Sequence, residues 1–212
     1  MVKGIVMLFR QKYFYIKDLI LGTSKKWDDM SVSQNEAVQF AHKYMNPEPS
    51  PRRGQDSSPE YVLAHYGQLI NWQLRKDEIT DDCRRVSEVI SKCTTKIPIV
   101  AYRGVNDNVY QKMKEAAKGL PGIDFYEKGF LCASLVKGFE SKGYINIRIY
   151  IPEGSNAIYL GNVNDEEEVY YPIGIQCGAR LKIISCDDKY VNCYLIKTDG
   201  ISDTTPTDNL KT

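Results

Sequence analysis

The sequence predicts a single α+β domain, with helices in the first half of the chain and strands in the second. Apolar residues recur at helical spacing up to about residue 95, and short β-branched and aromatic runs fill residues 96–198. Helices followed by strands favour α+β over a doubly wound parallel sheet. No Gly-x-Gly-x-x-Gly follows a strand, which argues against a Rossmann-type dinucleotide site.

Four helices are expected. The first follows Ser33, which with Glu36 three residues later has the pattern of a capping box. A proline-rich loop precedes the second helix, at 59–75, and two more are expected at about 80–93 and 108–118. The residues expected on the inner faces of the first three are Ala37, Phe40, Ala41, Tyr44, Val62, Leu63, Tyr66, Leu69, Ile70, Leu74, Val86, Val89 and Ile90.

The second half predicts short strands bounded by turn residues. They are expected at 97–103, 130–135, 143–151, 156–160, 168–171, 178–186 and 190–197. Residues 144–151 alternate, so one face of that strand is covered and the other is more polar. The domain is expected to span 1–198, and the polar residues 199–212 are expected to form a flexible tail.

Composition excludes several function classes. The 212 residues carry a net charge of +1, so no overall field draws the protein to nucleic acid or to an anionic membrane. The early apolar run 4–9 is too short to span a bilayer and short for a signal peptide. None of the six cysteines forms a Cys-x-x-Cys pair, so no metal site is predicted. Because no secretory signal is recognised in the sequence, its six cysteines are expected to stay reduced, which predicts a protein that works in a reducing compartment.

An acidic string near residue 166 precedes an apolar run, Val169-Tyr170-Tyr171, which predicts a short strand bounded by Pro172. Side chains alternate along a strand, so Glu166 and Glu168 would share one face. Neighbouring carboxylates repel each other, an arrangement that is unfavourable as structure and useful as chemistry. For the acidic string alone, the alternative is a solvated loop.

Two further segments give the string its context. A β-rich run ends in Tyr102-Arg103-Gly104, and the strand 130–135 carries Ser134. The order Arg, Ser, Glu-x-Glu resembles the mono-ADP-ribosyltransferases of the Arg-Ser-Glu class, which include clostridial binary toxins, exoenzymes that modify Rho and related bacterial effectors.

Other motifs extend the resemblance over roughly residues 30–197. The segment 152–160 resembles the family's Pro-Lys-Gly-Ser-x-Ala-x-Tyr strand, and 168–174 resembles its Glu-Val-Leu-Leu-Pro-x-Gly. Residues 70–75 resemble the helical Ile-Asn-x-x-Leu-Arg, and 139–142 resemble the Phe-x-x-Arg of the loop that covers nicotinamide. Each motif is weak alone, but their common order and spacing are specific.

The resemblance implies a fold and a chemistry. Helices would pack on two mostly antiparallel, roughly perpendicular sheets that form a central NAD cleft. The enzyme would transfer ADP-ribose from NAD, its co-substrate, to an arginine of a target protein and release nicotinamide. Bond cleavage makes the ribose oxocarbenium-like, as in glycoside cleavage. Glu168 would stabilise that charge, and Ser134 would orient Glu168.

The resemblance also implies which residues hold NAD. Arg75 and Arg103 would bind the pyrophosphate through forked donors, and Lys142 would add a charge. Gly104 would let the backbone approach the nicotinamide amide, and Phe139 would stack on its ring. The remaining cofactor-binding positions are Asn71, in the helical motif, and Cys132.

Glu166 is expected to select the acceptor. A carboxylate can bind a guanidinium and take its proton during attack, and in the family a Glu at this position accompanies arginine acceptors. The acidic run begins at Asp165, so the register matters. Only Glu166 and Glu168 form a Glu-x-Glu, and only Glu168 directly precedes Val169.

The chain departs from the family in two places. Cys132-Ala133-Ser134 stands where members usually have Ser-Thr-Ser, and a thiol is a poorer hydrogen-bonding group than a hydroxyl. Cys132 is either an inert buried thiol or an oxidation-sensitive one. The loop of residues 161–165 is short and lacks the aromatic that members use to grip a target, so the target is expected to be recognised differently.

Three functions stay open: an arginine-directed transferase, an NAD glycohydrolase or non-arginine transferase of the same fold, and an inactive binding module. Arg103, Ser134, Glu166 and Glu168 together argue against the inactive module. The expected partners are NAD and an unidentified target protein, with no nucleic acid, no metal and no membrane insertion. We expect a monomer that acts in a cytosol as a delivered bacterial effector, or as a phage or viral protein.

Overall fold

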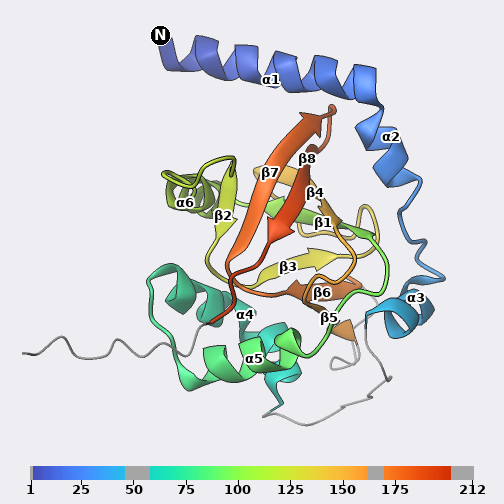
Figure 1. Ribbon diagram of the computed structural model, residues 1–212, viewed down its shortest axis with the longest axis vertical. Coiled ribbons are helices and arrows are strands. Elements are labelled where there is room, and N and C mark those ends of the chain that lie inside the picture. The colour runs from blue at the N-terminus through green and yellow to red at the C-terminus, as the bar shows by residue number, and fades with distance from the viewer. Residues whose placement is uncertain (1, 46–57, 162–169, 202–212) are drawn as a thin grey trace, which may run out of the picture.

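The structure is a computed structural model that describes residues 2–45, 58–161 and 170–201. Its helices are α1 (Val2–Leu21), α2 (Thr23–Asp28), α3 (Ala37–Tyr44), α4 (Pro59–Arg75), α5 (Asp81–Ser91) and α6 (Asp107–Ala116). Its strands are β1 (Ile99–Val105), β2 (Phe125–Glu127), β3 (Leu131–Ser134), β4 (Ile145–Ile151), β5 (Ala157–Tyr159), β6 (Pro172–Ile175), β7 (Ala179–Cys186) and β8 (Val191–Lys197). Figure 1 shows α1 across one end of the strands, with α4 and α5 at the opposite end. The predicted α+β class is confirmed.

The strands form one eight-stranded sheet in the order β2-β7-β8-β4-β1-β3-β6-β5, antiparallel except where β4 pairs with β8. Strands β1 and β4 pair along their whole length, whereas β1 and β3 meet at the single residue pair Tyr102 and Ser134. Beyond this link the strands change direction, so β3 and β6 run across the steeper β7 and β8 in Figure 1. The two crossing sheets expected from the sequence are therefore two parts of one sheet. We call β2, β7, β8, β4 and β1 the five-stranded part, and β3, β6 and β5 the three-stranded part.

Both faces of the five-stranded part are covered. Along β1, Ile99 and Ala101 belong to the main core between the two parts, while Val100 and Tyr102 pack with Trp27 of α2 on the other face. This alternation follows from strand geometry. The more polar face predicted for residues 144–151 is covered only in part by α2: Arg148 is buried and Tyr150 is half-buried, but Tyr144 is 63% exposed.

Arg148 of β4 shows how α2 is attached to that face. It is one of the largest fully buried side chains, and a buried charge needs partners. Its guanidinium lies 3.0 Å from a carboxylate oxygen of Asp28 in α2 and 3.0 Å from one of Asp187, and it donates to Asn192. It also lies 4.8 Å from the centre of the Tyr190 ring. These contacts tie the N-terminal helices to the sheet.

Helix α4 has the bounds that its sequence predicts. Ser58 is its N-cap and accepts a hydrogen bond from the Tyr61 N–H, and proline stands at the first helical position. The expected inner face is only partly correct, because Tyr66 and Leu69 are 53% and 55% exposed. The helix buries a narrower stripe than the spacing suggested. Its buried apolar residues are Val62, Leu63, Ile70 and Leu74.

The Ser33–Glu36 capping box is not formed. The Ser33 hydroxyl donates to the Glu36 carboxylate, and Glu36 itself is the N-cap of α3 without a side-chain capping bond. The helix therefore begins at Ala37. Its position still agrees with the expected inner face, since Ala37 and Ala41 are fully buried.

The strand expected at 168–171 is wrong in position. Residues 162–169 lie outside the described residues, Tyr170 is in a turn, and β6 begins at Pro172, where the strand was expected to end. Tyr171 has a φ of 44°, which is incompatible with extended backbone. A proline is acceptable as the first residue of a strand.

Three other elements differ from expectation. Helices α1 and α2 and strand β2 were not predicted, and Gly22, with a φ of 63°, separates the two helices. The expected tail begins too early, because Asp199 pairs with Arg180 at 2.9 Å and the Gly200 N–H donates to Cys177. Only residues 202–212 of that expected tail lie outside the described part of the chain.

Candidate active site

Three charged side chains from three elements meet at one point. Arg75 is the last residue of α4, Arg103 lies in β1, and Glu127 ends β2. The Glu127 carboxylate accepts hydrogen bonds from Arg75 Nε at 2.9 Å, from Arg75 Nη2 at 2.8 Å and from Arg103 Nη2 at 3.2 Å. The Gly129 N–H donates another at 3.0 Å. We call Arg75, Glu127 and Arg103 the arginine cluster.

The arginine cluster has more positive charge than its single carboxylate can balance. Glu127 is 1% exposed, and burial alone would raise the pKa of its carboxyl. The positive charges of Arg103 and Arg75 and their hydrogen bonds outweigh burial and hold this pKa below its ordinary value. Two guanidinium charges against one carboxylate leave a net charge of +1. Arg103 Nη1 is buried without a hydrogen-bond partner. Because such groups are normally satisfied, the cluster fits an anionic ligand.

Two pockets flank the arginine cluster. Arg103 lines one of about 140 Å³ together with Cys132, Ser134 and Phe139, which we call the inner pocket. Arg75 and Glu127 line another of about 270 Å³, the outer pocket, with Lys112 and Tyr126. The structure thus brings together five of the predicted site residues, namely Arg75, Arg103, Cys132, Ser134 and Phe139.

The segment that carries Phe139 into the wall of the inner pocket is fixed by contacts with two tyrosines. Phe139 packs edge-on against Tyr171, with ring centres 5.3 Å apart. The next residue, Glu140, accepts a hydrogen bond from the Tyr190 hydroxyl at 2.5 Å and one from the Gly138 N–H at 2.8 Å. Burial and the nearby Glu140 raise the pKa of Tyr190, so its phenol stays protonated and donates. These bonds fix the segment that carries Phe139.

Gly104 has a structural reason to be glycine. A Cβ added there would lie 1.7 Å from the backbone oxygen of Ser141, which also lines the inner pocket. The glycine therefore lets β1 and the segment at Ser141 come into contact. Its predicted approach to a nicotinamide amide stays a prediction. Lys142 is exposed and is not among the residues that line the inner pocket.

Ser134 and Asn71 both bond to nearby backbone. The Ser134 hydroxyl donates to the Val136 carbonyl at 2.9 Å and accepts from the Val136 N–H at 3.1 Å. The Asn71 amide donates to the Phe130 carbonyl at 3.0 Å and accepts from the Phe130 N–H at 2.7 Å. Asn71 thus fastens α4 to the segment before β3. Their predicted roles toward Glu168 and NAD stay predictions.

Cys132 is half-buried beside the arginine cluster, and burial raises the pKa of its thiol. A protonated thiol is a weak nucleophile, which agrees with the inert alternative for this residue. Glu166 and Glu168 lie outside the described residues. The described chain resumes at Tyr170, two residues after Glu168, and Tyr170 lines the inner pocket.

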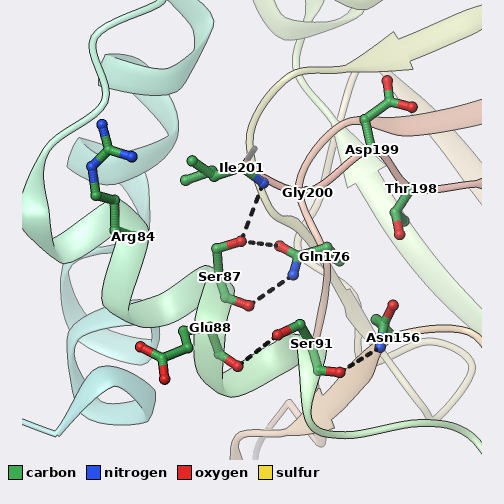
Figure 2. Close-up of a pocket in the computed structure, with 10 residues that line it drawn as sticks. All are labelled: Arg84, Ser87, Glu88, Ser91, Asn156, Gln176, Thr198, Asp199, Gly200 and Ile201. Carbon is green, nitrogen blue, oxygen red and sulfur yellow. Dashed lines mark hydrogen bonds between the residues drawn. The ribbon is translucent and has the colours of Figure 1, made fainter. Parts of the chain in front are cut away.

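A third pocket, shown in Figure 2, lies between α5 and the chain after β8 and has a volume of about 360 Å³. Its polar groups bond to one another. The Ser87 hydroxyl donates to the Gln176 side-chain oxygen at 3.1 Å, and the Ile201 N–H donates to that hydroxyl at 3.3 Å. None of the predicted site residues lines it. Across 2–45, 58–161 and 170–201, no group of three or more His, Cys, Asp or Glu side chains could hold a metal ion.

One family profile matches residues 59–199, described as ADP-ribosyltransferase exoenzyme. The chain belongs to this family. Its members transfer ADP-ribose from NAD, and the match includes the arginine cluster and both pockets that flank it. A search of curated proteins finds no match.

Solved structures agree with this assignment at the level of the fold. The Plx2a ADP-ribosyltransferase toxin from Paenibacillus larvae is 15% identical with a TM-score of 0.63, covering 79% of this chain and 98% of that one. The structure of C3stau2 from S. aureus with NAD is 16% identical with a TM-score of 0.60, covering 79% and 97%. The Clostridium limosum C3 exoenzyme is 16% identical with a TM-score of 0.57, covering 78% and 96%.

Sequence reasoning missed Glu127, the centre of the arginine cluster. The available signal was an acid two residues before Gly129 and the apolar run that follows it. From the sequence alone, a single carboxylate in a short polar segment is expected to be exposed to solvent. Its burial depends on contacts with residues 52 and 24 positions away, which local pattern does not reveal.

Proposed function

We propose that the protein transfers ADP-ribose from NAD to an arginine side chain of a target protein and releases nicotinamide. The observation that carries the NAD-binding part of this proposal is the arginine cluster, with its net positive charge, the unpaired Arg103 Nη1 and a pocket on each side. The pyrophosphate of NAD carries two negative charges, and guanidinium forks suit phosphate oxygens.

The two pockets give NAD an orientation in this proposal. The pyrophosphate contacts Arg103 and Arg75, and the nicotinamide riboside enters the inner pocket beside Phe139. The adenosine end lies toward the outer pocket. The aromatic face of Phe139 suits the nicotinamide ring, and Asn71 keeps α4, and with it Arg75, in place.

Glu168 is the proposed catalytic carboxylate. The bond between ribose C1′ and the nicotinamide nitrogen breaks, and its electron pair leaves with nicotinamide, so positive charge develops on the ribose. A carboxylate beside the ribose stabilises that charge and accepts a hydrogen bond from the 2′-hydroxyl. Support comes from the position of Glu168 in the sequence, two residues before Tyr170 at the inner pocket.

Glu166 is the proposed acceptor-side base. It binds the incoming guanidinium and takes the proton that a guanidinium nitrogen loses as it bonds to C1′. A carboxylate is needed there because the arginine side chain stays protonated in water and is a poor nucleophile. The target protein is recognised without an aromatic at the short loop 161–165. We expect a toxin or effector setting, as in the similar bacterial toxins.

A second candidate function is NAD hydrolysis, or transfer to another acceptor, by the same site. Cys132 in place of the usual first serine and the short loop 161–165 favour it. Both functions need Glu168 and the arginine cluster. They differ only in what captures the ribosyl cation, so Glu166 separates them.

The test compares two activities in two variants. Glu168→Ala should lower both NAD hydrolysis and transfer by ~10²–10⁴-fold, since it removes charge stabilisation in the transition state. Glu166→Gln should lose transfer to agmatine, a simple guanidino acceptor, while hydrolysis persists. Near-normal turnover in a folded Glu168→Ala variant would refute the mechanism. Unchanged transfer in Glu166→Gln would exclude its role with an arginine acceptor.

The target is found by a separate measurement. Labelled NAD and a cell lysate are incubated with the wild-type protein, and mass spectrometry locates the modified side chain. Modified arginine supports the proposed reaction. Label on another residue type, or label released only as free ADP-ribose, favours the second candidate.

A further inference from the structure

Helix α1 exposes an unusual amount of apolar surface. Six of the fourteen large apolar side chains that are exposed in the described residues fall between residues 13 and 21. They are Tyr13, Tyr15, Ile16, Leu19, Ile20 and Leu21. Leu19 is 69% and Ile20 is 78% exposed. Such gathering on one element marks an interaction site, whereas single exposed apolar residues are ordinary.

The outward direction of this face is fixed by a buried anchor. Asp18 is buried, and one of its carboxylate oxygens accepts hydrogen bonds from the Ser24 N–H at 3.0 Å and the Ser185 hydroxyl at 2.7 Å. With ~100° per residue, Tyr13, Ile16 and Ile20 lie about 160–220° around the helix from Asp18. Asp18 therefore turns Tyr13 and Ile20 away from the sheet, whereas Ile16 lies at the edge of this face, next to the strand ends. Figure 1 shows α1 along the outside of the molecule.

The charge of the N-terminal helices differs sharply from that of the remaining chain. Helices α1 and α2 carry six basic residues and two acids, a net charge of +4, so the remaining residues carry +1 minus +4, or −3. Both acids are already engaged, Asp18 in its anchor and Asp28 with Arg148 and Lys137. Lysines remain on the outside, with Lys12, Lys25 and Lys26 exposed. The net charge of +1 for the whole chain is therefore the sum of a positively charged N-terminal part and a negatively charged remainder.

The apolar face continues onto the body of the protein. A groove of about 490 Å³ lies between α1 and the strand ends, lined by Tyr15 and Ile16 of α1 and by Tyr144, which is 63% exposed. Lys12 and Lys189 lie at the same groove, as do Asp187, which pairs with Arg148, and Asp188. Tyrosines and lysines beside aliphatic residues are the composition of helices that lie in a lipid interface.

We propose that the outer face of α1 docks the protein on an anionic lipid surface. Ile16, Leu19 and Ile20 enter the boundary between headgroups and acyl chains. The exposed lysines Lys12, Lys25 and Lys26 meet the acidic headgroups. Charge decides between this occupant and a second copy of the chain, because a symmetric pairing through α1 would bring two cationic helices together. None of the described helices is long and apolar enough to cross a membrane.

The proposal is tested by flotation of the full chain with vesicles of phosphatidylcholine, with and without phosphatidylserine. We expect binding only with phosphatidylserine, and less binding at high salt, because the Debye length falls from ~10 Å at 0.1 M to ~3 Å at 1 M. Ile16→Glu with Ile20→Glu should lower binding ~10-fold or more. Lys12→Gln with Lys25→Gln should lower it roughly 30-fold.

Ile79→Glu with Ile196→Glu is the matched control, since both isoleucines are 46% exposed and lie away from α1. This control should float like the wild type, and all variants should keep the wild-type melting temperature because the changed residues are not in the core. No flotation, or equal flotation without phosphatidylserine, would overturn the proposal. An equal loss of binding in the control would also overturn it. So would a dimer in solution that the Ile16→Glu, Ile20→Glu variant dissociates.

Discussion

Replacing Glu127 with glutamine should destabilise the protein and weaken NAD binding together, because two buried guanidinium groups depend on one carboxylate. The side chains of Arg75 and Arg103 are 13% and 11% exposed. At an effective dielectric constant of about 20, opposite charges ~3 Å apart attract by ~5 kcal/mol, an attraction that desolvation of the ions offsets in part. Removing one partner of a buried ion pair costs ~3–5 kcal/mol. Glu127→Gln should therefore lower the melting temperature by about 6–20 °C for a chain of this size.

The assay for Glu127→Gln is thermal and urea unfolding, together with calorimetric titration of NAD. Asp77→Asn is the matched control, because Asp77 pairs with Lys128 near the site but is 75% exposed, and exposed pairs contribute ~0–1 kcal/mol. The stability difference between wild type and Glu127→Gln should be full above pH ~4.3, the ordinary glutamate pKa, and should shrink as pH falls through the lowered pKa of Glu127. Equal stability of Glu127→Gln and Asp77→Asn would refute this account of the arginine cluster.

Three other substitutions test particular contacts by thermal unfolding. Gly104→Ala should cost ~3 kcal/mol, because its Cβ would meet the Ser141 backbone oxygen at 1.7 Å, and a wild-type melting temperature would contradict that close packing. Asn71→Ala should cost ~1–3 kcal/mol by leaving the buried Phe130 N–H unsatisfied, and a wild-type melting temperature would contradict the role of Asn71 in fastening α4. Arg148→Met should cost ~3–5 kcal/mol, since the two carboxylates that it pairs with lose their counter-charge, and a neutral result would mean that these acids are well solvated.

Elements with complete local signals could be predicted from the sequence. Helix α4 was located to the residue from its apolar spacing after the proline-rich loop, and the capping serine and N-terminal proline that the structure shows agree with this start. Its buried face was overestimated, since the spacing that places Tyr66 and Leu69 near the inner stripe does not say what packs against them. The strand before Pro172 was misplaced because the left-handed conformation of Tyr171 has no signature in an apolar run.

The residues of the candidate site also divide into those that sequence motifs predicted and those that they could not. Arg75, Arg103, Ser134 and Phe139 were predicted from motifs in a common order, and the structure brings them to adjoining pockets. Glu127 could not be predicted, because its importance comes from three elements meeting in space. The register of Glu166 and Glu168 stays a prediction, since both lie outside the described residues.

The single residue pair that joins the two parts of the sheet has a mechanical consequence. A continuous ladder resists bending through many hydrogen bonds at once, whereas in the described residues the two parts of the sheet pair only at Tyr102 and Ser134. The compliance of the sheet is therefore concentrated at this joint. Both residues line the inner pocket, and Arg103 is the next residue after Tyr102. A small rotation of the three-stranded part about the joint would change the width of the inner pocket, and its extent is limited by the main core, to which both parts contribute side chains.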